Sequence, residues 1–271
     1  MKRITLITLG LSIAACTASS PLSSSSTPAT AADYEDTAQT IASATVTGDS
    51  SGLNFGDVIV FRDALDIARG RLPLGFVRDS DNHCHGSHMG VGHDFTVACK
   101  DAAGATQTAC NAVTDSATVT VKLTGSLQTP SLSFSIDREA SFTLTGLQSA
   151  TATFNGDSSF SLDESLTSVF RQGVTSALMF DATAGYKAIT VTTADRTITG
   201  GSASFEVKAH RTVTGTGGGS GSGMGSNHDV DKSFDVTAML TFNGDGTATL
   251  VLDGTQTFKI DLKTGKITKV M

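Results

Sequence analysis

The chain has 271 residues, with 19 basic and 26 acidic side chains, a formal net charge of −7, no Trp and two Tyr. An acidic chain without a basic run lacks the charge that binds nucleic acid or docks a protein on anionic lipid. The length suits a single β-sandwich or barrel domain behind N-terminal segments. We therefore expect no nucleic-acid partner.

The first residues have the features of an export signal. Two basic residues precede an apolar run that, at about a dozen residues, is too short to span the ~30 Å hydrocarbon core as a helix. The run ends in Ile13-Ala14-Ala15-Cys16, which resembles the lipobox of bacterial lipoproteins. The resemblance implies a signal peptide over 1–15 and fatty acyl chains, such as palmitate, on Cys16. The alternative is an ordinary signal with a chance cysteine at its end.

An acylated Cys16 would place the protein in the bacterial cell envelope, with the membrane as its partner through the lipid. Each buried methylene contributes roughly 0.8 kcal/mol, so several chains form a lasting anchor. Thr17 stands where the resemblance would require Asp for inner-membrane retention, which favours the outer membrane. Residues 16–32 are rich in Ser, Thr, Ala and Pro and predict a flexible tether of about 20–25 Å.

Two helices are expected near the start of the domain, which we assign to 33–271. Asp36 to Gln39 resembles a capping box, and a short helix could continue to Val46. A stronger pattern predicts a helix over 57–69, with Asp57 as its cap, an apolar stripe and Gly70 as its stop.

Strict alternation of apolar and polar residues dominates from about Asp94 onward. The alternating segments are 117–123, 132–136, 140–144, 150–154, 203–209, 234–242, 248–252 and 258–262. Alternation predicts strands with one buried and one wet face, whereas parallel sheets bury both faces and give continuous apolar runs. We expect roughly ten to thirteen short antiparallel strands.

Turn signals favour hairpin connections between these strands. Asn155-Gly156-Asp157 and Asn243-Gly244-Asp245-Gly246 both carry Asn-Gly, the strongest short hairpin signal. The segment 161–172 could be a strand edge or a short capped helix. The predicted fold is mainly β: an antiparallel meander curled into a sandwich or half-barrel, with one or two short N-terminal helices packed on it.

Besides Cys16 the chain has Cys84, Cys99 and Cys110. Disulfides persist in the oxidising compartments that export implies, and three thiols allow three single pairings. We favour Cys99–Cys110, because the two residues bracket a turn-like segment between candidate strands. Cys84 would then remain a free thiol.

Potential metal ligands are concentrated in 79–94, which we interpret as a His-rich loop. Its candidate ligands are His83, Cys84, His85, His88 and His93. Imidazole and thiolate suit Cu or Zn, and an extended His83-x-His85 would place two imidazoles on one side of the backbone. Met224 and His228 could complete the set. The alternative is a His-rich surface segment that binds nothing with purpose.

No convincing catalytic group appears. The Gly-rich segment 215–226 lacks the ending of a phosphate loop and is typical of a spacer loop. Gly48 to Gly52 matches the G-x-S-x-G pattern outside the strand–turn–helix context that a nucleophile requires. His210 falls on the wet face of a strand, where we expect a cross-strand partner rather than a general base.

The β domain resembles those of uncharacterised β-rich envelope lipoproteins. The resemblance is carried by Asp33-Tyr34-Glu35-Asp36, the two cysteines at 99 and 110, the Asn-Gly-Asp turns, and the closing segment 249–254. It implies fold and location, and no activity. The first functional hypothesis is a non-enzymatic structural or interaction module. The alternatives are a Cu- or Zn-binding lipoprotein and a carrier of apolar ligands.

Overall fold

A computed structural model describes residues 27–45, 56–88, 90–128, 132–167, 175–214 and 230–270. Cys16, most of the 16–32 segment, and the Gly-rich segment 215–226 lie outside these residues. The elements are α1 Ala31–Thr45, α2 Asp57–Ala68, β1 Val77–Ser80, β2 His83–His88, β3 Val91–Lys100, β4 Ser116–Gln128, β5 Leu132–Thr145, β6 Thr151–Thr167, β7 Thr175–Thr192, β8 Ile198–Thr214, β9 Val230–Phe242, β10 Thr247–Leu252, β11 Gln256–Asp261 and β12 Ile267–Val270.

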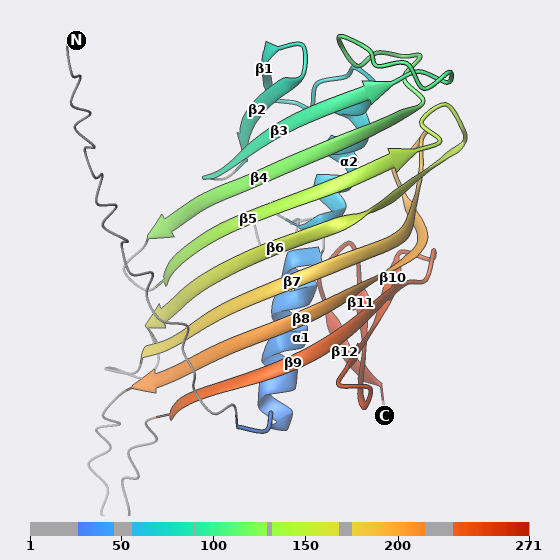
Figure 1. The fold of residues 1–271 in the computed structure, drawn as a ribbon. Helices are drawn as coiled ribbons and strands as arrows, with labels where there is room; N and C mark the ends of the chain where they lie inside the picture. The colour runs from blue at the N-terminus through green and yellow to red at the C-terminus, as the bar shows by residue number, and fades with distance from the viewer. Residues whose placement is uncertain are drawn as a thin grey trace, which may run out of the picture.

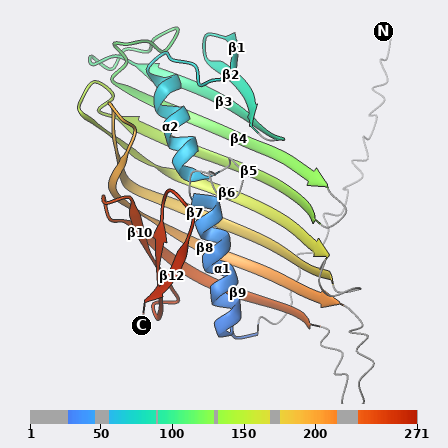
Figure 2. The same ribbon diagram turned by 180° about the vertical axis from the view of Figure 1, so that it is seen from behind.

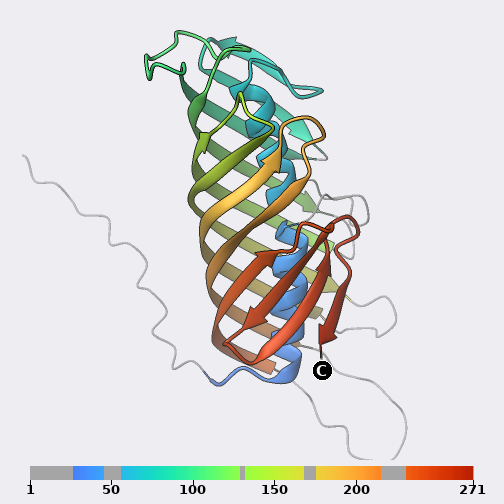
Figure 3. The ribbon, with the colours of Figure 1, turned by 90° about the vertical axis from the view of Figure 1, so that its right-hand side faces the viewer.

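The strands form one sheet in which each pairs antiparallel with its neighbours in sequence, from β1 to β12. This confirms the predicted antiparallel meander, and the sheet curls without closing (Figures 1 and 3). Several strands are longer than expected, with 17 residues in β6 and 18 in β7. The two alternating segments at 132–136 and 140–144 belong to the single strand β5. The alternation continues between them, but the inward position there is taken by the buried polar residue Arg138, which interrupts the apolar pattern.

The two helices cover the inner face of the curled sheet (Figure 2). Helix α2 contacts β3 and β4, while α1 contacts β10, β11 and β12. Phe61 of α2 is fully buried, and its ring centroid lies 5.2 Å from those of both Phe142 and Phe154 and 5.5 Å from that of Tyr186. The contacts with Phe142 and Tyr186 are edge-to-face and the contact with Phe154 is tilted, and such aromatic pairs add to the hydrophobic burial that holds the helix on the sheet. Among the described residues no helix is long and apolar enough to cross a membrane.

Helix α1 begins elsewhere than the sequence pattern predicted, whereas α2 begins at Asp57 as predicted but has a different cap residue. Helix α1 begins at Ala31 rather than near Asp36, because Thr30 and Asp33 form the reciprocal bonds of a cap: the Thr30 backbone N–H donates to the Asp33 carboxylate at 2.6 Å. Gly56 takes the cap position of α2. Asp57 is therefore the first helical residue, and its side chain points into the core.

The two Asn-Gly signals have different outcomes. Residues 243–246 form the turn between β9 and β10, as predicted. The hairpin predicted at 155–157 is wrong, because these residues lie inside β6 at a bulge opposite β7. A Cβ at Gly156 would collide with the Ser141 carbonyl oxygen of β5, and the Asn155 side chain accepts a hydrogen bond from the Ala188 backbone N–H at 2.8 Å. Close approach of two strands thus explains the glycine.

Cys99 and Cys110 form a disulfide, with their Cα atoms 5.4 Å apart. It links the end of β3 to the loop before β4. Cys84 is a buried free thiol, in agreement with the favoured pairing. Of the segment 161–172, the part up to Thr167 is strand, and the remainder lies outside the described residues.

Candidate metal centre at the β1–β2 edge

The segment 79–94 is not a loop: it contributes to β1, β2 and β3. Its side chains alternate as strands require, and Gly86 lets β2 pass over a packed aromatic ring. A Cβ at Gly86 would lie 2.7 Å from the Phe76 ring. The register pairs Val77 of β1 with His85 and pairs His85 in turn with Asp94 of β3. The histidine-rich composition therefore belongs to the edge of the sheet.

Alternation divides the expected ligands between the two faces of β2 and β3. His83 and His85 lie on the outer face, close together as predicted, with ring centroids 6.2 Å apart. Cys84 and His93 lie on the inner face and are 2% and 1% exposed. The His93 ring packs against Phe76 and Phe95 in the core. These two residues are therefore separated from the outer pair by the sheet itself.

The side chains of three further candidates lie outside the described part of the chain. His88 belongs to β2, but its side chain lies outside the described residues. Met224 and His228 also lie outside the described residues.

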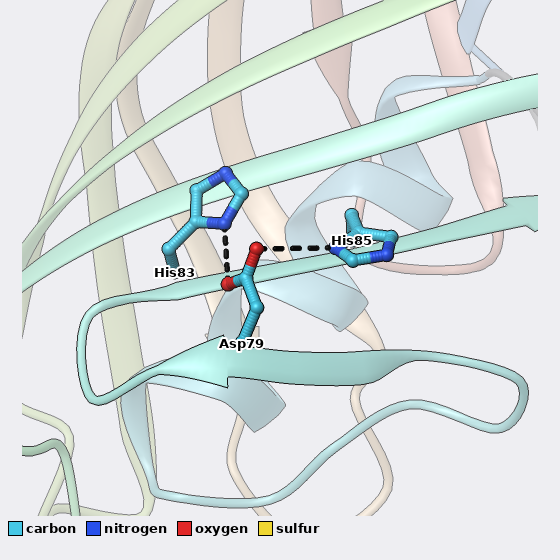
Figure 4. Close-up of side chains that lie close together, drawn as sticks. All are labelled: Asp79, His83 and His85. Carbon is cyan, nitrogen blue, oxygen red and sulfur yellow. Dashed lines mark hydrogen bonds and ion pairs between the residues drawn. The ribbon is translucent and has the colours of Figure 1, made fainter.

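Asp79 of β1 joins the two outer histidines, although the sequence did not point to it. One ligand atom from each of Asp79, His83 and His85 can be chosen so that all lie within 4.8 Å of one another. The Asp79 carboxylate lies between the imidazoles: His83 Nδ1 is 2.6 Å from Oδ1, and His85 Nδ1 is 3.5 Å from Oδ2 (Figure 4). Asp79 was missed because the pairing of β1 with β2 cannot be read from composition.

A second carboxylate, that of Asp94, contacts the imidazole nitrogen of His83 that faces away from Asp79. His83 Nε2 lies 3.0 Å from both Asp94 oxygens. The hydrogen bond to Asp79, followed by that to Asp94, raises the pKa of His83. The same His83–Asp79 bond lowers the pKa of the Asp79 carboxyl. In the absence of a metal, the two carboxylates therefore favour a charged imidazolium.

The cluster has the donor atoms of a metal site that remains open to solvent. Two imidazole nitrogens and a carboxylate suit Zn(II) or Cu(II), and ligands at about 2.0–2.2 Å from a tetrahedral ion lie about 3.3 Å from one another. The separations of 2.6 and 3.5 Å run to different oxygens of Asp79, and one ligand atom from each of the three side chains lies within 4.8 Å of the others, so the side chains must rearrange around an ion to reach that spacing. The side chains of Asp79 and His85 are 46% and 51% exposed, so water or a partner could occupy a fourth position.

No protein-family model, curated protein or solved structure matches this chain.

Two other polar groups stand apart from this cluster. On the outer face, His210 Nδ1 lies 2.9 Å from Ser233 Oγ and His210 Nε2 lies 3.4 Å from Asp231. The Asp231 side chain is 80% exposed, so water competes for the bond that would orient His210 as a base. The arrangement agrees with a solvated cross-strand contact.

The second group is buried beneath the start of α2. Arg138 of β5 forms an ion pair with Asp57, and Tyr186 of β7 donates to the same carboxylate at 2.9 Å. Desolvation opposes the charge on Arg138, but Asp57 and Tyr186 together more than offset it and raise the arginine pKa. The sequence carries a sign of this buried pair, since the charged residue Arg138 occupies an inward position of a strand whose other inward residues are apolar. Its partner could not be identified without the helix placement.

Proposed function

We propose that this is a lipid-anchored bacterial envelope protein whose β domain binds Zn(II) or Cu(II) through Asp79, His83 and His85 in a non-enzymatic role. The observation that supports the proposal best is the convergence of these side chains on the outer face of β1 and β2. The lipobox resemblance at Cys16 supports the anchor and an envelope location, with the outer membrane favoured by Thr17.

The donor set supports a divalent borderline metal over Cu(I). Soft sulfur ligands select Cu(I), whereas imidazole and carboxylate suit Zn(II) and Cu(II). Cys84 points to the opposite face, and burial raises the pKa of its thiol to about 11. The cluster of three described side chains therefore offers nitrogen and oxygen alone.

The partial exposure of the ligands supports reversible binding. Structural zinc sites are closed by four protein ligands, while sites with three keep a position for water or another molecule. A three-ligand site on an edge hairpin would therefore exchange its metal with solvent or a partner. This favours capture or buffering of metal over a structural role.

Titration with a competing fluorescent indicator tests the proposal. Zn(II) and Cu(II) should bind the wild-type chain with sub-micromolar affinity. Structural zinc sites gain about 10–16 kcal/mol from four ligands, so each ligand contributes on the order of 3 kcal/mol, or about 100-fold. The His83→Ala/His85→Ala variant should bind both metals at least about 100-fold more weakly than the wild type. The control variant His210→Ala should keep the wild-type affinity. Millimolar wild-type binding, or equal binding by the double variant, would overturn the proposal.

A carrier of apolar ligands remains the second candidate, and the curled sheet favours it. Its inner face is covered by α1 and α2, however, and the groove lined by Val58, Ile198 and Leu262 measures about 270 Å³. Ligand pockets commonly measure about 300–1,000 Å³. A carrier role would thus require the helices to move, and native mass spectrometry of protein from membranes would reveal a retained lipid.

A further inference from the structure

Asp94 contacts His83 on the side of the imidazole away from Asp79. The Nδ1 atom of His83 faces the Asp79 carboxylate and His85, whereas Nε2 faces Asp94, with both of its oxygens at 3.0 Å. Asp94 of β3 is paired with His85 of β2 in the antiparallel register of the two strands. The two carboxylates therefore approach opposite edges of one ring from two different strands.

A neutral imidazole has a single lone pair for a metal, and the other nitrogen carries the proton. Histidine ligands commonly donate this remaining N–H to a carboxylate, which fixes the tautomer and the ring orientation. Asp94 is in the position that such a carboxylate requires. Asp79 is on the opposite side, among the ligand atoms that converge.

We propose that Asp94 is a positioning residue that holds the proton of His83 on Nε2 and so directs Nδ1 toward a metal shared with Asp79 and His85. The inference depends on the proposed metal-binding function. When the metal binds, any proton on Nδ1 leaves to solvent, and the Nε2–H bond to Asp94 is retained. The site then has a carboxylate ligand, Asp79, and a separate carboxylate that orients a ligand, Asp94.

The proposal assigns different roles to two aspartates that the same histidine contacts. Removal of Asp79 would remove a ligand. Removal of Asp94 would leave all three ligands in place but free the His83 ring to rotate or change tautomer. Loss of an orienting partner of this kind commonly lowers metal affinity by about 10–100-fold.

Zinc titration of the full domain distinguishes these roles. Asp94→Ala should weaken Zn(II) binding about 10–100-fold, and Asp94→Asn should recover part of the loss, because its amide oxygen can still accept the Nε2–H bond. Asp181→Ala, on the outer face of β7, is the matched control and should bind as the wild type does. Circular dichroism of each variant establishes that the sheet is retained.

Nitrogen-15 NMR of the zinc-loaded protein provides the readout that a structural role would not change. The wild type should show His83 with zinc on Nδ1 and the proton on Nε2, and Asp94→Ala should lose this single pattern. Equal affinity and an unchanged pattern in Asp94→Ala, or zinc on Nε2 of the wild type, would overturn the role of Asp94 while leaving metal binding intact. Failure of the wild type to bind zinc would instead overturn the proposed function.

Discussion

Arg138, at an inward position of β5, forms an ion pair with Asp57, the first residue of α2, and both side chains are almost completely buried. Removing one member of a buried pair leaves the other charge unpaired, at about 3–5 kcal/mol. We therefore expect Arg138→Met to lower the free energy of unfolding by this amount in urea denaturation.

The double variant Arg138→Met/Asp57→Asn supplies the control, because it removes both charges of this pair from the core. It should be more stable than the single Arg138→Met variant. Equal stability of the two variants would contradict a role for the charge of Asp57.

Asp63 predicts a pH dependence of stability. Burial, followed by repulsion from Asp66, raises the pKa of this α2 carboxyl from 3.8 to about 7. Its Oδ2 atom is buried and has no hydrogen-bond partner among the residues that the structure describes. Between pH 3.8 and about pH 7, Asp63 is protonated in the folded protein but ionised in the unfolded chain. The free energy of unfolding therefore falls as the pH rises through this range. The decrease in the free energy of unfolding, relative to its value below pH 4, is complete above pH 7 and is at most about 4 kcal/mol.

Asp63→Asn removes this titration. Its stability relative to the wild type should increase from pH 4 to pH 7 and then remain constant, as measured by urea unfolding at each pH. A difference that stays flat across this range would show that Asp63 does not titrate as expected.

The cysteines predict distinct chemical behaviour. In a chain that begins at Thr17, thiol reagents at pH 8 should leave the folded protein unlabelled and should label Cys84 alone after unfolding, because Cys84 is buried and its pKa is raised to about 11. The disulfide closes a loop with a sequence separation of 11. Cys99→Ala/Cys110→Ala should therefore lose about 3 kcal/mol of stability. Rapid labelling of the native protein would exclude the buried environment of Cys84.

The lipid anchor is tested at Cys16. Protein isolated from bacterial membranes should begin at Cys16 and carry the mass of several acyl chains, whereas Cys16→Ser should appear in the soluble fraction. Wild-type protein that is soluble and carries no acyl mass would contradict the lipobox interpretation.

Periodicity was sufficient to predict most of the strands from β3 onward, because every inward position of a half-buried sheet must be apolar or paired, but it did not mark β1, β2, β7 or β12 as strands. It also predicted that His83 and His85 share a face. Local turn chemistry was less reliable. The Asn-Gly at 243–244 forms a turn, while the same dipeptide at 155–156 lies in a strand because β5 and β7 pass close to it.

Contacts between elements could not be predicted. The approach of Asp79 to the histidines depends on the register of β1, and the pairing of Asp57 with Arg138 depends on where α2 lies across the sheet. Both are tertiary relationships between residues whose separate patterns give no sign of a partner. Composition alone also grouped Cys84 and His93 with His83, although alternation assigns them to the other face.

Anomalous diffraction from crystals grown with one equivalent of Zn(II) per chain tests the proposed metal centre most directly. The proposal predicts one strong peak at about 2.0–2.2 Å from an Asp79 oxygen, His83 Nδ1 and His85 Nδ1. A peak elsewhere on the chain, or none at this edge of the sheet, would contradict it.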